Sequence, residues 1–179
     1  MLMKEIAKKL YVMQIQYAGI PEDVYHFLKE EERAMLMEKR GRFFLKDEAR
    51  KRIRVALAGG TFDILHIGHI FTLNEAKKHG DVLVVAVARD EHIHRKGRQP
   101  VHPQEYRRMM VDSLKMVDVS VSGFEDPKKM VEFVDPDVIV YGYDQPEFIK
   151  PKGVEVVKLS QKIDDSRFKT GKILGDLGF

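Results

Sequence analysis

The chain has 179 residues, of which 44% are hydrophobic and 33% charged, so it can bury the core of one substantial domain. It contains no cysteine, which excludes disulfides and thiolate chemistry, and its net charge of +3 suits an anionic substrate without favouring nucleic acid as a partner. Charged residues interrupt the N-terminal segment and no apolar run reaches membrane-spanning length, so we expect a cytoplasmic protein with no membrane partner.

Residues 1–50 are rich in charge and show helical spacing of their apolar residues, with Gly19 and Gly41 placed to end helices. Residues 43–54 are predicted to form either a short wing-like hairpin or a helical linker. We interpret residues 1–50 as a small helical appendage that could be winged-helix-like, and residues 51–179 as the main domain. Acidic residues interrupt the basic surface of the appendage, which favours packing or dimerisation over DNA binding.

From residue 53 onward, short apolar strands alternate with amphipathic helices. The predicted strands are residues 53–58, 82–88, 117–121, 138–141 and 154–159, and the predicted helices are residues 67–79, 103–114 and 127–134. This alternation predicts an α/β fold, a Rossmann-like five-stranded parallel sheet with flanking helices. Ligands are then expected beyond the carboxyl ends of the strands.

One motif lies where the first of these strands meets its helix. Gly59 and Gly60 allow backbone N–H groups to approach a phosphate closely, and the helix that follows directs its own N–H groups to the same place. His66 and His69 are three residues apart and share one helical face, where both imidazoles can stabilise charge on a transferring phosphate. We therefore predict His66 and His69 as catalytic residues.

A basic segment, residues 92–98, follows the second strand. A flexible loop of this kind can fold over a triphosphate, and Lys96 is predicted as a catalytic residue that brings a mobile cation to the phosphates. His92 and His94 lack a third ligand, so no metal site built from protein side chains is predicted.

The run Gly60-Thr61-Phe62-Asp63, followed by His66-Ile67-Gly68-His69, resembles the signature of the HxGH nucleotidyltransferase superfamily, which includes cytidylyltransferases, several adenylyltransferases and archaeal FAD synthetases. Residues 87–145 are similar to the archaeal FAD synthetases in particular. The resemblance implies transfer of AMP from ATP to FMN, giving FAD and pyrophosphate, with Mg²⁺ or another divalent cation bound with the nucleoside triphosphate.

The resemblance also implies roles for individual residues. Asp63 is expected to orient the acceptor. The expected nucleotide-binding residues are Gly59, Gly60, Thr61, Phe62, Ile67, Gly68, Arg107, Gly142, Asp144, Gln145, Lys169 and Thr170. Near the C-terminus, where the superfamily has a Ser/Thr-rich turn, only Thr170 fits well and Lys169 replaces a hydroxyl residue.

Two other functions remain open at this point. One is a cytidylyltransferase acting on CTP and glycerol phosphate or another phosphorylated alcohol, although such enzymes typically have a tryptophan where Gln145 stands and this chain has none. The other is a nucleotide-sensing regulator whose N-terminal module binds DNA. The sequence leaves a homodimer open as well.

Overall fold

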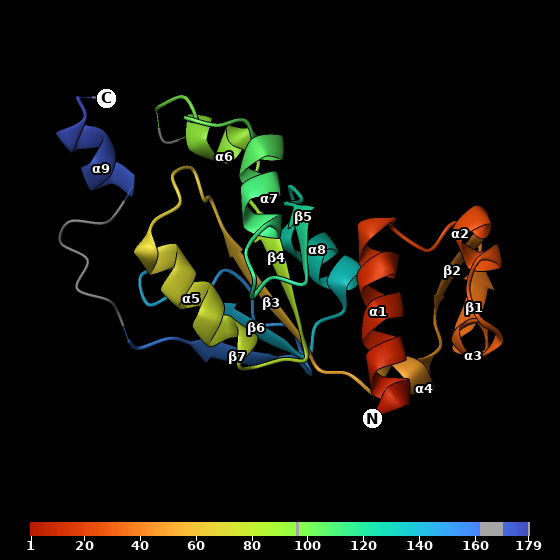
Figure 1. Ribbon diagram of the computed structural model, residues 1–179. Coiled ribbons are helices and arrows are strands. Elements are labelled where there is room, and N and C mark those ends of the chain that lie inside the picture. The colour runs from red at the N-terminus through yellow and green to blue at the C-terminus, as the bar shows by residue number, and fades with distance from the viewer. Residues whose placement is uncertain (96, 162–169, 179) are drawn as a thin grey trace.

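A five-stranded parallel sheet forms the centre of the computed structural model, which describes residues 1–95, 97–161 and 170–178 (Figure 1). Across the sheet, the strands are β5 (Val119–Ser122), β4 (Val82–Val87), β3 (Val55–Gly60), β6 (Val138–Tyr141) and β7 (Glu155–Lys158). The predicted α/β, Rossmann-like fold is confirmed. β3 extends past its predicted end at Ala58, so that Gly59 and Gly60 pair with Ala86 and Val87 of β4.

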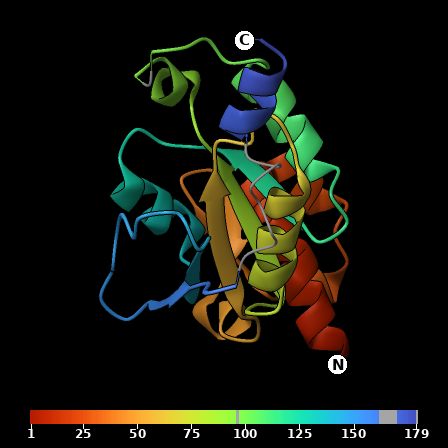
Figure 2. The same ribbon diagram turned by 90° about the vertical axis from the view of Figure 1, so that its left-hand side faces the viewer.

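Helices cover both faces of the sheet (Figures 1 and 2). α5 (Ile67–Lys77) and α7 (Gln104–Asp112) pack on one face, whereas α8 (Pro127–Val134) and α1 (Leu2–Gln16) pack on the other. Because successive side chains of a strand point to opposite faces, Leu57 joins the core beneath α1 and α8 while Ala58 joins the core beneath α5.

The strand order reverses next to β3. The chain leaves β3 toward β4 on one side and returns later to place β6 on the other side. In an open parallel sheet, such a reversal leaves a crevice at the carboxyl ends of the two strands, where ligands bind. Residues 59–69, which we call the glycine-histidine motif, begin in the last two residues of β3 and run into α5. The motif therefore lies at this crevice.

α1 packs beside α8 on one face of the sheet, next to the edge strand β5, whereas residues 142–154 join β6 to β7 without a helix. The Tyr11 hydroxyl, fully buried in α1, donates a hydrogen bond of 2.6 Å to the Val134 carbonyl at the end of α8. Arg50 adds an ion pair of 3.0 Å with Asp137. The N-terminal segment thus shares its core with the sheet, and a domain boundary at residue 50 stays a prediction.

The rest of the N-terminal segment consists of short elements. They are α2 (Glu22–His26), α3 (Glu30–Arg33), the antiparallel hairpin of β1 (Leu36–Lys39) and β2 (Arg42–Leu45), and α4 (Asp47–Arg50). The prediction of a helix up to Gly41 is wrong, because Arg40 and Gly41 have positive φ angles and form a hairpin turn. Three of the four residues of α3 are Glu, and this negative charge opposes contact with a DNA backbone.

Two further helices complete the described chain. α6 (Asp90–His94) takes in the start of the segment that was predicted as a basic loop, and α9 (Thr170–Asp176) lies near the C-terminus. No helix in the described parts of the chain is both long and apolar enough to cross a membrane.

Candidate functional site

The turn between β3 and α5 has a tightly packed backbone. An added Cβ at Gly60 would lie 2.7 Å from the Phe62 ring, so only glycine fits there. Phe62 has a φ of 52°, which a residue with a large side chain rarely adopts. Its ring is buried, and the centroid of the ring lies 5.1 Å from that of the His69 ring. Packing therefore fixes the course of the turn that leads into α5.

His66 and His69 meet as a stacked pair. His66 caps the start of α5, and the ring centroids of the two histidines are 3.8 Å apart with 29° between the ring planes. An added Cβ at Gly68 would lie 3.1 Å from two atoms of the His66 ring, so the glycine between the histidines leaves room for this stacking. The predicted convergence of the two imidazoles is present in the structure.

The environment keeps His69 uncharged in the absence of a ligand. Burial and the neighbouring His66 lower the pKa of His69 to about 4, although the Asp144 carboxylate partly opposes this shift. The Nδ1 atom of His69 is buried and has no hydrogen-bond partner within the described residues. A bound anion would favour the protonated ring and could supply that partner.

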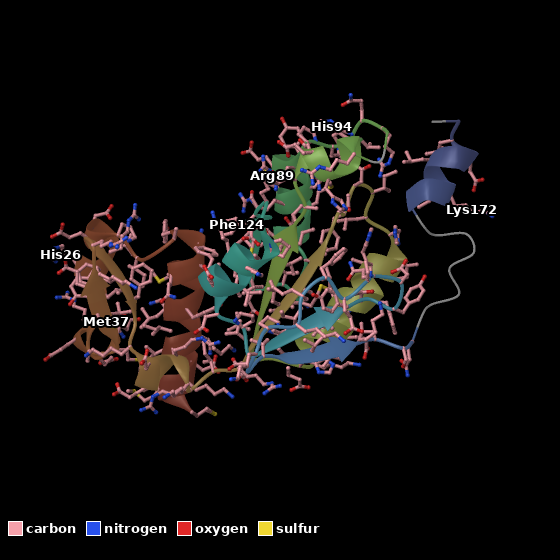
Figure 3. All side chains as sticks on the ribbon, turned by 180° about the vertical axis from the view of Figure 1, so that it is seen from behind. His26, Met37, Arg89, His94, Phe124 and Lys172 are labelled. Atoms are coloured by element: carbon pink, nitrogen blue, oxygen red, sulfur yellow. The ribbon has the colours of Figure 1, made fainter. Side chains whose placement is uncertain are left out.

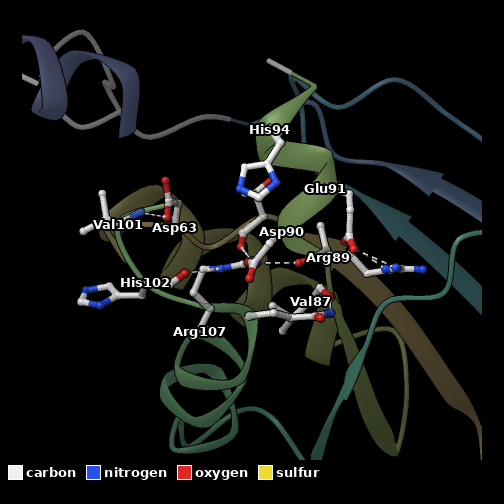
Figure 4. A network of polar contacts seen from close by, with 12 residues as sticks. Asp63, Val87, Arg89, Asp90, Glu91, His94, Val101, His102 and Arg107 are labelled. Carbon is white, nitrogen blue, oxygen red and sulfur yellow. Dashed lines mark hydrogen bonds and ion pairs between the residues drawn. The ribbon is translucent and has the colours of Figure 1, made fainter. Parts of the chain in front are cut away.

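Asp63 connects the turn to the loop after α6 (Figure 4). Its buried carboxylate forms an ion pair with Arg98 and accepts a hydrogen bond of 2.8 Å from the Val101 backbone N–H. These contacts hold residues 98–101 against the glycine-histidine motif. The acceptor-orienting role predicted for Asp63 stays a prediction, and in this state the carboxylate positions the loop.

Arg107, a predicted nucleotide-binding residue, is buried beside the site. Its side chain is fully buried in α7 and is not on the wall of the pocket described below. The guanidinium donates to the backbone carbonyls of Thr61, Ala88 and His102 and forms an ion pair of 2.6 Å with Asp90 (Figure 4). All these contacts are internal, so Arg107 holds the ends of β3 and β4 together in this structure, and its predicted contact with the nucleotide stays a prediction.

The end of β6 faces the same turn. The Gln145 side-chain amide donates a hydrogen bond of 2.8 Å to the Gly59 carbonyl, and its oxygen accepts one of 2.9 Å from the Gly142 N–H. Gln145 therefore links the two strands that border the crevice. Asp144 immediately precedes Gln145 in the chain and is close enough to His69 to affect the pKa of that imidazole.

These elements enclose a pocket of about 610 Å³, a size typical of small-molecule sites. Most of the predicted site residues line it: Gly59, Gly60, Thr61, Phe62, Asp63, His66, Ile67, Gly68, His69, Gly142, Asp144 and Gln145. Lys96 and Lys169 lie outside the described residues. Thr170 is the first residue of α9, and the next residue, Gly171, also lines the pocket.

A second group of pocket residues was not among the individual site residues predicted from the sequence. Arg98 and His92 line the pocket from the segment around α6. Phe124 and Phe148 line it from the loops after β5 and β6. The basic composition of residues 92–98 indicates a loop that can fold over a triphosphate, whereas the loops that carry Phe124 and Phe148 have no recognisable motif beyond their position after a strand.

The site can accept a divalent cation together with a polyphosphate. No three His, Asp or Glu side chains gather closely enough to hold a metal by themselves within residues 1–95, 97–161 and 170–178. Mg²⁺ in nucleotide sites is usually held by phosphate oxygens and one or two carboxylates, and Asp144 places a carboxylate on the same pocket wall as His69. These residues fit a cation that enters with the triphosphate.

Comparison with known proteins agrees with this geometry. A model of the cytidylyltransferase-like family matches residues 57–172, from β3 into α9. A protein of Aciduliprofundum boonei named FAD synthase is 45% identical over 128 residues, covering 66% of this chain and 86% of that protein. A Thermococcus kodakarensis protein of the same name is 40% identical over 141 residues, covering 72% and 93%.

A solved structure shares the fold. The Thermoplasma volcanium protein described as a lipopolysaccharide core biosynthesis protein superposes with a TM-score of 0.58 at 39% sequence identity. The match covers 63% of this chain and 99% of that one.

Proposed function

Given that this chain belongs to the cytidylyltransferase-like family, we propose that it transfers AMP from ATP to FMN, giving FAD and pyrophosphate. The observation that carries the proposal is the stacked His66–His69 pair on the pocket wall, at the start of α5 and beyond the glycines of β3. The relatives named FAD synthase support ATP and FMN as the substrates. A cytoplasmic location, predicted from the sequence, is part of the proposal.

The reaction is an in-line displacement at phosphorus. An oxygen of the FMN phosphate attacks the α-phosphorus of ATP while the bond from that phosphorus to the oxygen bridging toward the β-phosphate breaks. The electron pair leaves with pyrophosphate. The attacking phosphate is already ionised near neutral pH, so the reaction needs no general base.

The chain's own groups stabilise the negative charge of the triphosphate. The N–H groups of His69 and Ile70 donate to the His66 carbonyl, so those of Ile67 and Gly68 at the start of α5 are the ones that can bind a phosphate. The two imidazoles add hydrogen-bond donors beside them. When bound with the triphosphate, Mg²⁺ neutralises part of the phosphate charge. Contacts from Lys96, Lys169 and Thr170 to the phosphates remain part of the proposal.

The direct test pairs nucleotides with acceptors. The full chain is incubated with Mg²⁺ and either ATP or CTP, together with either FMN or glycerol phosphate, while pyrophosphate and FAD are measured. We expect pyrophosphate and FAD from ATP with FMN. Pyrophosphate from CTP with glycerol phosphate, and none from ATP with FMN, would replace this proposal with the cytidylyltransferase alternative.

Variants of the two histidines separate catalysis from binding. We expect His66→Ala and His69→Ala to lower kcat about 100-fold or more while the KM for ATP changes little, because their donors act mainly on charge that develops during transfer. His26→Ala, which alters an exposed histidine outside the pocket, is the control. Equal losses in kcat and in ATP affinity would contradict a role in the transition state.

A further inference from the structure

The pocket extends across the edge of the sheet to its second face. Its polar part, with His66 and His69, lies on the α5 side. Other lining residues lie on the α8 side and form what we call the aromatic lobe: Leu57, Phe124, Met130, Val131, Ile139 and Phe148. Gly59 lies between the two parts and has no side chain to separate them.

Two phenylalanines remain partly exposed in the aromatic lobe. Phe124 is 43% exposed and Phe148 is 64% exposed. Each packs against a second ring. The ring centroid of Phe124 lies 5.4 Å from that of Phe133 in α8, and the ring centroid of Phe148 lies 6.3 Å from that of Tyr141 in β6. Figure 3 shows Phe124 beside α8. A ligand that covers exposed aromatic area of this kind binds with a more favourable free energy.

The chemistry of the lobe distinguishes between possible occupants. The lobe side chains are all apolar, so they offer no partner for the donors and acceptors around the edge of an adenine or cytosine ring. The dimethylbenzene end of a flavin ring system carries no such groups and matches an apolar wall. A small phosphorylated alcohol would leave the two phenylalanines uncovered.

We propose that the aromatic lobe binds the flat ring system of a flavin acceptor, while the acceptor's phosphate crosses Gly59 and Gly60 to reach the histidines. This inference rests on the proposed function and assigns Phe124 and Phe148 as residues that determine acceptor specificity. The nucleotide then uses the polar part of the pocket. Acceptor and donor approach the reacting phosphorus from opposite faces of β3.

Flavin binding to the full chain without ATP tests this assignment. The dissociation constants of FMN and of riboflavin, which lacks the phosphate, are measured by flavin fluorescence. We expect both ligands to bind, and Phe124→Ala and Phe148→Ala each to raise both constants about 5-fold to 10-fold, because each removes one aromatic contact. The KM for ATP should stay within about two-fold of wild type.

Phe27→Ala is the matched control, because Phe27 is 92% exposed and does not line the pocket. Thermal unfolding checks that all three variants fold. The aromatic-lobe assignment is overturned if the wild type binds neither flavin, or if the Phe124 and Phe148 variants bind flavin as the Phe27 variant does. It is also overturned if they raise the KM for ATP instead.

The two proposals fail in different ways. FAD formation by the wild type with no effect of either phenylalanine variant would remove the aromatic-lobe assignment and leave the proposed function intact. Flavin binding that depends on both phenylalanines, without FAD formation from ATP, would remove the proposed function and leave a flavin-binding lobe.

Discussion

His69 is the site residue whose protonation depends most on what occupies the pocket. With the pocket free of ligand, burial and His66 lower the pKa of His69 to about 4, so the ring is neutral near pH 7. The negative charge of a triphosphate would raise this pKa toward neutrality. Nucleotide binding near neutral pH should therefore be accompanied by proton uptake.

The same shift makes stability depend on pH. His69 titrates at about 4 in the folded chain and near its ordinary 6.5 when unfolded, so the unfolded state binds more protons between these values. Stability is full above 6.5 and falls as pH drops toward 4. We expect the wild type to lose about 2 kcal/mol more than His69→Gln between about pH 7.5 and about pH 5, measured by denaturant unfolding. Identical losses in both proteins would contradict the lowered pKa.

An arginine can bind a phosphate or hold backbone carbonyls together, and the contacts of Arg107 are of the second kind. Its guanidinium satisfies three backbone carbonyls and Asp90 in a fully buried position. We expect Arg107→Lys to lower the free energy of unfolding by about 2 kcal/mol, because a lysine keeps the charge but cannot reach all four partners. Denaturant unfolding measures this loss.

The control for Arg107 is Arg108→Lys, at the next position of α7, which should change the free energy of unfolding by less than about 0.5 kcal/mol. If Arg107 contacted a phosphate instead, Arg107→Lys would raise the KM for ATP and leave stability unchanged. That result would support the role implied by the family resemblance.

At the scale of elements, α1 is the helix that joins the N-terminal segment to the sheet. Leu10 is fully buried in the same core as α8 and the sheet. We expect Leu10→Ala to destabilise the whole chain by about 3 kcal/mol, because the cavity opens in that shared core. Unfolding should remain a single transition when followed by circular dichroism and by tyrosine fluorescence.

Leu2→Ala provides the comparison, since Leu2 lies in the same helix and is exposed. It should shift the transition little. Two separate transitions in the Leu10 variant, with only one of them shifted, would instead support an independent domain of residues 1–50.

The sequence predicted the elements best where one signal dominated. Valine-rich strands such as β4 and β6 are buried on both faces, and their composition marks them clearly. The hairpin of β1 and β2 was placed wrongly because its first strand contains Met, Glu and Lys, which also suit a helix, and only the Arg40–Gly41 turn distinguishes the two. The four-residue helix α4 is too short to show a helical period.

At the scale of the whole molecule, the sequence predicted the part of the site that is continuous in the chain. Residues 59–69 form one continuous connection from β3 into α5, so the spacing of the glycines and histidines in the sequence determines where they lie relative to one another. The aromatic lobe combines residues from β3, β6, α8 and two loops, which only the strand order brings together. The internal partners of Arg107 could not be predicted for a similar reason, because they come from separate strand ends.

The position of α1 has a consequence for synthesis of the chain. Tyr11 leaves the ribosome early, yet the carbonyl it bonds belongs to Val134, 123 residues later. At the usual pace of translation this interval is on the order of 10 s, during which α1 can pack against β2, α3 and α4 but not against α8 or β5. The nascent chain therefore exposes the apolar residues of α1 that face α8 and the sheet until those elements emerge, so this side of α1 is where a chaperone would act.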